Sequence, residues 1–379
     1  MNVKIKGLIL ILLLFLLIAF PVDAKEPADE LYEQQLEASG AEDVVDSVPE
    51  EARELMDRLG ISDLNPDSVI GLSFGEIIEV LYSGVKEHAG APLRALVSVI
   101  GIVLLSAVLD AAKPERGERA LSGVYEIVAV LCISACLVLP VTGVISAAAE
   151  AIEACGEFTK IYVPVFAGVM ITGGQTVSAG SFQILTLTVS QLFITAATGF
   201  IAPLLTIFLA LSIAGSAARG IDLGAIAGGI KKAALWALAF IASVYVALMT
   251  LQSVIGSASD TATLKAAKFV VSNAVPVVGG ALGDALGSVQ GSIRLLKSSL
   301  GAFGIVAAAG IFLPVILESA LWSLFMNLGA ASADIFGQKQ VSALLRNISS
   351  VLGVLLAVLL VCMMIIVFST AVMLTLGGG

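Results

Sequence analysis

The chain has little charge, one histidine and four cysteines. Charged residues make up 13% of its 379 residues, about half of the ~25% that soluble globular domains carry. Hydrophobic residues reach 58%, and the mean hydropathy is +1.02. This composition excludes a soluble protein and predicts an all-α, polytopic integral membrane protein folded as one large helical bundle.

Histidine and cysteine are too scarce and too scattered for a metal centre or a disulfide framework. The single histidine, His88, lies at a predicted membrane boundary. Cys132 and Cys136 are four residues apart in an apolar helix, where we expect small buried residues on one face. Cys155 and Cys362 are isolated in the sequence. We therefore expect no bound metal.

Motifs for catalysis and for phosphate binding are missing as well. The sequence contains no HExxH, no GxSxG and no pair of acids near an exposed histidine. The glycine pairs Gly173-Gly174 and Gly279-Gly280 lack the Lys-Ser/Thr pair that completes a P-loop. No basic stripe suited to nucleic acid is present. We expect a protein that is not an enzyme, needs no cofactor and does not bind nucleic acid.

Most of the acidic charge lies near the N-terminus. Residues 1–24 combine two lysines, an apolar run and Val22-Asp23-Ala24, which indicates a secretory signal peptide, with a retained signal anchor as the alternative. Residues 25–67 hold fourteen Asp or Glu and three Lys or Arg, a balance of −11 against −10 for the whole chain. We expect residues 25–91 to be an exported acidic segment that begins with short solvated helices and linker.

An amphipathic helix is predicted over residues 73–88, at the end of this segment. Ser73-Phe74-Gly75-Glu76 resembles a capping box, and the apolar residues that follow share one helical face. That face would lie on the membrane surface, bind a partner or pack on the chain's own bundle.

Two stretches of the apolar region repeat each other about 111 residues apart. Val163-Pro164-Val165-Phe166-Ala167-Gly168 matches Val275-Pro276-Val277-Val278-Gly279-Gly280 at an offset of 112. Gly199 and Pro203 match Gly310 and Pro314 at an offset of 111. Broken apolar segments at corresponding places in two halves of a chain are typical of the substrate-binding region of transporters. We predict two tandem repeats, 121–232 and 233–345, that contain Pro/Gly-broken or re-entrant helices.

Apolar spans flank the two repeats. A first transmembrane span is predicted over 92–112 and a last one over 350–376, and each is long enough to cross a ~30 Å hydrocarbon core. With the broken stretches between them, we expect six full crossings plus two re-entrant or interfacial elements. Ten crossings result if each broken part crosses separately.

Basic residues predict the orientation of the chain in the membrane. Three clusters, spaced by about the repeat length, contain Lys113/Arg116/Arg119, Arg219/Lys231/Lys232 and Lys339/Arg346. By the positive-inside rule all three face the cytoplasm, in agreement with an exported N-terminus. Each repeat then has an even number of crossings, so the two copies run parallel and the C-terminus returns to the exported side.

The glycine-rich segment 269–292 is the most unusual part of the membrane region. Its glycines recur every four residues, which lets two helices approach closely in lipid, and its polar residues should avoid lipid. We interpret it either as an intramolecular packing face or as a pore-lining or subunit-contact helix. The candidate residues are Asn273, Pro276, Gly279, Gly283, Asp284, Gly287 and Gly291, with Pro164, Gly173 and Gly174 as weaker counterparts in the first copy.

Two acidic residues lie within predicted spans. Glu318 follows Pro314 by four residues in an apolar stretch. The residue at the equivalent position of the first repeat is Ile207, so the carboxylate is not shared by the two repeats. An intramembrane carboxylate is a candidate for proton or ion coupling, and the alternative is a residue that hydrogen-bonds to neighbouring helices. Glu126 lies near the cytoplasmic end of its span, where we expect it to reach the headgroups.

The layout of the chain resembles the stage III sporulation protein AE family of endospore-forming bacteria. The resemblance rests on the signal peptide, the acidic segment, the polytopic remainder and the stretch Lys268-Phe269-Val270-Val271-Ser272-Asn273-Ala274-Val275-Pro276-Val277-Val278-Gly279-Gly280 with Gly283-Asp284. It implies a membrane component of the channel complex between mother cell and forespore, in the outer forespore membrane. Other membrane proteins of that complex, the lipid bilayer and further copies of the chain would then be its partners.

Three functions remain open on the sequence alone. The first is a subunit of a secretion-like or feeding channel, favoured by the exported segment and the glycine face. The second is a stand-alone secondary transporter with a midplane solute site in the broken repeats, favoured by the repeat and by Glu318. The third is a passive scaffold that anchors soluble partners through residues 25–90.

Overall fold

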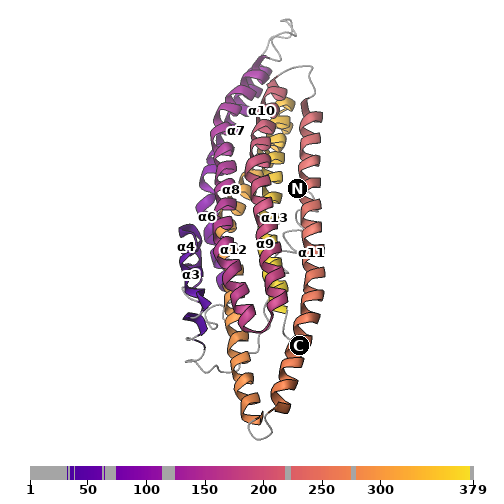
Figure 1. Cartoon of the computed structure of the whole chain (residues 1–379). Helices are drawn as coiled ribbons and strands as arrows, with labels where there is room; N and C mark the ends of the chain where they lie inside the picture. Colours follow the sequence, from indigo (N-terminus) through magenta and orange to yellow (C-terminus); the bar gives the residue numbers. More distant parts are fainter. Residues whose placement is uncertain are drawn as a thin grey trace.

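A computed structural model describes residues 32, 35–37, 39–61, 64, 74–112, 124–217, 223–274 and 279–375. Among these residues almost all are helical and none lies in a strand. Figure 1 shows long helices packed side by side in one elongated bundle. The predicted all-α, multi-pass membrane architecture is confirmed.

Short helices precede the long ones along the chain. In order, the elements are α3 (Ala41–Asp46), α4 (Glu50–Arg58), α6 (Phe74–His88), α7 (Gly90–Ala111), α8 (Val124–Thr172), α9 (Thr176–Ala196), the π-helix η1 (Ala197–Ile201), α10 (Ala202–Ala217), α11 (Leu223–Ala274), α12 (Gly279–Ile335) and α13 (Lys339–Thr375).

The described residues contain six helices long and apolar enough to cross a membrane, with α9, η1 and α10 counted as one. A ~30 Å hydrocarbon core needs only about 20 helical residues. Helices α8, α11 and α12 have 49, 52 and 57 residues. These three helices are therefore more than twice as long as a bilayer requires, and parts of them extend beyond it.

Helix α13 is the central element of the bundle. It contacts α8, α9, α10, α11 and α12, and 72% of its most apolar stretch is buried against them. The most apolar stretch of α12 is 67% buried. The corresponding stretch of α11 is only 17% buried, the lowest value among the six candidate membrane helices. The uninterrupted apolar sequence of α13 thus reflects burial inside protein as well as hydrophobic surroundings.

Small residues set the spacing between α8, α12 and α13. Tyr162 of α8 packs directly over Gly304 of α12, and its hydroxyl lies 3.1 Å from the Thr370 hydroxyl of α13. A Cβ atom added at Gly301 would lie only 2.6 Å from the Leu374 side chain of α13. Only a residue without a side chain allows the three helices to come this close.

The predicted breaks at two prolines are wrong. Pro164 lies inside α8, and Pro314 lies inside α12. A proline removes one helical hydrogen bond, but packing against neighbouring helices on several sides supports the backbone there. Both α8 and α12 are continuous helices through these prolines. A local irregularity does occur at η1, the π-helical turn immediately before Ala202 and Pro203.

The helix order neither proves nor excludes the tandem repeat. Helix α8 followed by α9–α10, and α11 followed by α12, form two hairpins that run in the same order (Figure 1). Pro164 lies in the middle of a helix, while the second copy of its motif, at 275–278, lies outside the described residues. The repeat therefore stays a prediction.

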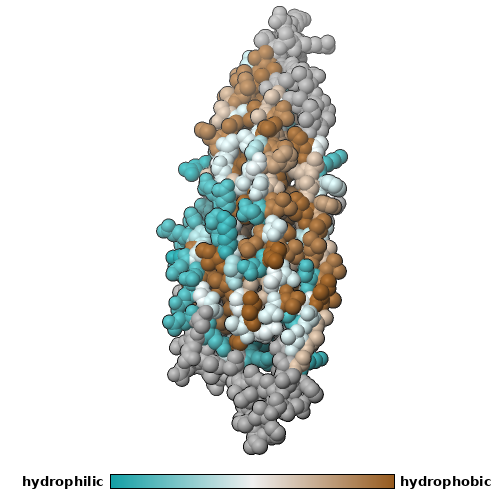
Figure 2. Space-filling model, in the orientation of Figure 1, coloured by the Kyte–Doolittle hydropathy of each residue, from teal (hydrophilic) through white to brown (hydrophobic). Residues whose placement is uncertain are grey.

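The acidic helices α3 and α4 pack on the bundle. Helix α3 contacts α8, and α4 contacts α12, where Ala52 lies against Gly310. Val44 of α3 and Met56 of α4 are buried. The short helices that the sequence predicts are thus solvated on one side only, because the few apolar residues of each helix share one face and bury it. Their acidic residues point outward and form the hydrophilic area over α3 and α4 in Figure 2.

Candidate functional site

The α8–α9 turn is built on Gly173 and Gly174, a pair that the sequence singles out. Gly174 has φ of 81°, a left-handed conformation that glycine adopts without strain. The N–H of Gln175 donates to the carbonyl of Met170 at 2.9 Å, and the N–H of Gly174 donates to Ile171 at 2.9 Å. This pattern is a Schellman motif, which ends α8 sharply and reverses the chain into α9.

A buried polar cluster surrounds the start of α9. Asp260 of α11 accepts hydrogen bonds from the N–H groups of Val177 and Ser178, both at 3.0 Å. Lys297 of α12 donates to the side-chain oxygen of Gln175 at 2.9 Å. Asp260 and Lys297 are 4% and 6% exposed. Three helices that are far apart in the sequence are thus joined at one point.

Charge complementarity explains why these groups lie together. The N-terminus of α9 carries partial positive charge and free N–H groups, and the Asp260 carboxylate satisfies two of them. Asp260 also attracts the Lys297 ammonium electrostatically, whereas Arg294 repels it. Buried charges need hydrogen-bond partners, and Asp260 has the two α9 N–H groups while Lys297 has the Gln175 side chain. Gly256 brings α11 close enough, because any side chain at that position would collide with Ser178.

A second cluster of the same design lies at the opposite end of the bundle. Gly337 has φ of 73°, and the N–H of Gln338 donates to Ala333 at 2.9 Å, which ends α12 as Gly174 ends α8. The Glu126 carboxylate of α8 then accepts the N–H of Gln340 at 2.7 Å and caps α13. Ser106 of α7 donates to the Gln338 side chain at 3.3 Å. Glu126 thus caps α13 from the half-buried position that it occupies at this end of the bundle. Its contact with the headgroups stays a prediction.

We expect Glu126→Ala to lower the free energy of unfolding by about 1 kcal/mol, because α13 loses an N-terminal cap. Glu126→Gln keeps an oxygen that can accept the same N–H, so its loss should be smaller. Apparent melting temperatures of the purified protein in detergent measure the series. Glu153→Ala, at an exposed position of the same helix, serves as the control and should leave the melting temperature unchanged.

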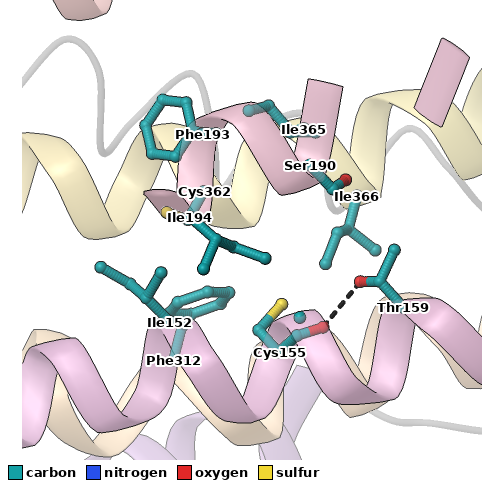
Figure 3. Close-up of a pocket in the computed structure, with 11 residues that line it drawn as sticks. Ile152, Cys155, Thr159, Ser190, Phe193, Ile194, Phe312, Cys362, Ile365 and Ile366 are labelled. Atoms are coloured by element: carbon teal, nitrogen blue, oxygen red, sulfur yellow. Dashed lines mark hydrogen bonds between the residues drawn. The ribbon is translucent and has the colours of Figure 1, made fainter. Parts of the chain in front are cut away.

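A small cavity lies in the core between α8, α9, α12 and α13. Figure 3 shows Cys155 and Cys362 on two of its sides, with Ser190 and Thr159 as its polar members. The Thr159 hydroxyl donates to the carbonyl of Cys155 at 2.7 Å, whereas the Ser190 hydroxyl is buried without a partner among the described residues. The cavity leaves about 20 Å³ to water, which is room for about one molecule. It is too small for an organic solute.

Two of the predicted site residues belong to the first cluster, and most of the others lie outside the residues whose side chains the structure describes. Gly173 and Gly174 form the α8–α9 turn, and Pro164 lies two residues after Tyr162 in α8. Pro276 lies outside the described residues, and so do the side chains of 267–274 and 279–289, which include Asn273 and Asp284. Gly291 has open space around it. The glycine face is therefore untested.

Glu318 does not lie in a polar site. It is half-buried on α12 beside Leu317, which packs against Gly84 of α6, and it forms no hydrogen bond or ion pair within the described ranges. Cys132 and Cys136 are exposed on α8, so the expectation that they are buried is wrong. No group of three or more His, Cys, Asp or Glu able to hold a metal occurs in the part of the chain that the structure describes.

Sequence reasoning missed the roles of Asp260, Lys297 and Glu126. One signal was present, because Asp260 is the only charged residue between Lys232 and Lys265 in α11. A lone acid in an apolar helix requires a buried partner. Its partner is the start of another helix, a group that no sequence motif reveals.

Comparison with known proteins gives the family. A sequence model of the family described as stage III sporulation protein AE matches residues 65–377. The chain belongs to this family. A relative from Bacillus subtilis (strain 168), stage III sporulation protein AE, is 24% identical over 234 residues, which is 62% of this chain and 59% of the relative. No solved structure matches. Membership of the stage III sporulation protein AE family implies a role in sporulation.

Proposed function

We propose that this member of the stage III sporulation protein AE family is a membrane subunit of a multi-protein channel complex between mother cell and forespore. The family match over residues 65–377 carries this proposal. Six long apolar helices supply a multi-pass membrane body. The description of the family names sporulation and no enzymatic activity.

The placement of the basic residues supports an exported N-terminus. Ser106 hydrogen-bonds with both Tyr125 and Gln338, so the α7–α8 connection and the α12–α13 turn lie at the same end of the bundle. Lys339 begins α13 at this end, and the cluster 113–119 belongs to the connection. By the positive-inside rule this end is cytoplasmic. The cluster around Asp260 and the acidic helices α3 and α4 would then lie on the exported side. With the protein in the outer forespore membrane, that side faces the space between the two membranes.

The test of the channel proposal is genetic and biochemical. In the sporulating organism, deletion of the gene should reduce heat-resistant spores by several orders of magnitude, and a full-length copy should restore them. An affinity-tagged copy purified from sporulating cells should bring down other membrane proteins of the assembly. Normal spore numbers after deletion, or a tagged protein that purifies alone, would refute the channel role.

A stand-alone transporter is the competing function. Glu318 favours it weakly, as a half-buried carboxylate without a partner among the described residues. The core cavity offers no room for a solute. Purified protein in lipid vesicles should therefore show no solute uptake of its own, with or without Glu318→Gln. Uptake that Glu318→Gln abolishes would make the transporter the better function.

A further inference from the structure

One face of the bundle is apolar at a level where the bilayer cannot cover it. We propose that this face, formed by Val177, Ile184 and Leu192 of α9 with Leu251, Val254 and Ile255 of α11, docks a second copy of this chain. We call it the α9–α11 face. The inference does not depend on the proposed channel function.

The length of α9–η1–α10 exceeds what lipid can cover. The combined helix, Thr176–Ser216, has 41 residues, and no charged residue occurs from 176 to 217. At 1.5 Å per residue, about 20 residues cross a ~30 Å core, and about 26 do so even at a 40° tilt. Some 15 residues of this uncharged helix must therefore lie outside the hydrocarbon.

Charged residues on the neighbouring helix show which part lies outside. Glu150, Glu153, Glu157 and Lys160 follow one exposed face of α8, and Glu157 and Lys160 pair at 2.7 Å. Each charge placed inside the bilayer would cost about 2.5–3.5 kcal/mol. Gly156 packs directly on Ile194, so this charged row lies beside the last turns of α9. The bilayer therefore ends near this level on the α8 side.

The first half of α9 extends beyond the charged row, toward the α8–α9 turn. Only twelve residues of α8, 161–172, separate Lys160 from that turn, too few to cross a bilayer. At the turn itself, Gly173 faces Ile293, next to the exposed Arg294 of α12. Charged residues thus bound this end of the bundle on both sides, and it does not lie in lipid.

Apolar side chains are nevertheless exposed there. Ile184 of α9 is 71% exposed, and Val254 and Ile255 of α11 are 66% and 63% exposed. Gly256 contacts Ser178, so these α11 residues lie level with the first turns of α9. In Figure 2 hydrophobic side chains lie on the side of α11, across the molecule from the hydrophilic area of α3 and α4. A contiguous exposed apolar surface outside the membrane marks a contact with protein.

The chain itself supplies the matching surface. The partner must present an apolar surface without charge, and the α9–α11 face meets that requirement, since residues 233–259 of α11 are uncharged as well. Sixteen residues of α9, 177–192, span about 24 Å, and two adjacent helices are about 20 Å wide. The patch then measures roughly 500 Å² on each copy, close to the ~1,000 Å² total that a specific interface needs. Two copies related by a twofold axis bury the same patch on both sides.

Disulfide cross-linking of full-length protein in intact membranes tests this docking. In a background without the four native cysteines, Ile184→Cys and Ile255→Cys should each form a dimer of twice the chain mass after oxidation. Two control positions are comparably exposed on other faces: Leu105 of α7, 62% exposed, and Glu153 of α8. Leu105→Cys and Glu153→Cys should give less than a tenth of that yield.

A charge on the face provides a second measurement. In protein extracted with its native lipid, mass measurement should find two copies of the chain. Ile184→Lys should reduce the fraction of dimer at least tenfold. Leu105→Lys should lower expression without shifting the ratio of dimer to monomer. Single copies in the unmodified protein, with no cross-link at either position, would overturn the proposal. A cross-link to a different protein would overturn it too. Sporulation defects of the deletion strain are independent of both outcomes.

Discussion

Gly304→Ala is expected to lower the free energy of unfolding by about 3 kcal/mol, at the upper end of the range for overpacked cores. A Cβ atom at this position overlaps the ring of Tyr162 and also its hydroxyl. Tyr162 cannot move aside easily, because it is 1% exposed, stacks on Phe158 with ring centroids 5.3 Å apart and hydrogen-bonds with Thr370. Helices α8 and α12 must separate to admit one methyl group. A lower apparent melting temperature in detergent, and less protein in the membrane, would report the loss.

Gly291→Ala on the same helix is the matched control, because nothing lies near its added methyl group. It should be neutral or slightly stabilising, as expected for alanine in place of glycine in a helix. Tyr162→Ala removes the clashing ring, so combined with Gly304→Ala it should be less damaging than the sum of the two single changes. Additive losses would show that the two residues do not meet as described.

The sequence predicts the fold class well, because composition and hydropathy report the environment of a membrane chain directly. The predicted last span, 350–376, is apolar almost throughout, and the structure places its residues 350–375 in helix α13. The sequence misleads at Pro164 and Pro314, because a proline breaks an isolated helix but not one that neighbouring helices hold in place. It also misleads at α3 and α4, since an acidic segment can still bury the narrow apolar side of each helix.

The polar cluster at the start of α9 is only partly predictable from the sequence. Gly173 and Gly174 stand out in the sequence because a left-handed turn favours glycine, and they do form the α8–α9 turn. The residues that bind this turn come from much later in the sequence. Asp260 follows its partner Val177 by 83 residues, and Lys297 follows its partner Gln175 by 122 residues. Those pairings depend on how α11 and α12 are aligned against α9. Helix alignment comes from packing at residues such as Gly256, and local sequence does not encode it.

The Asp260 cluster should be the most sensitive polar site of the bundle. Asp260→Ala removes the acceptor of two α9 N–H groups and the negative charge that attracts Lys297, and we expect the free energy of unfolding to fall by about 1–3 kcal/mol, because buried donors lose their partner. Asp260→Asn keeps an acceptor oxygen but not the charge, so its loss should be intermediate. Ser259→Ala, an exposed neighbour in α11, should change nothing. Apparent melting temperatures in detergent and spore counts measure the series.

The decisive comparison is the double variant Asp260→Ala/Lys297→Met. If the charge of Lys297 is tolerated mainly because Asp260 faces it, removing both charges should recover part of the loss, because an uncharged methionine needs no counter-charge in the protein interior. The two N–H groups of α9 stay uncapped in the double variant, so recovery should be incomplete by about the worth of one helix cap, ~1 kcal/mol. A double variant as unstable as the sum of both single changes would mean that Lys297 is held by its other neighbours. Full recovery would mean that the α9 cap contributes nothing, and that the loss in Asp260→Ala comes from the Lys297 charge alone.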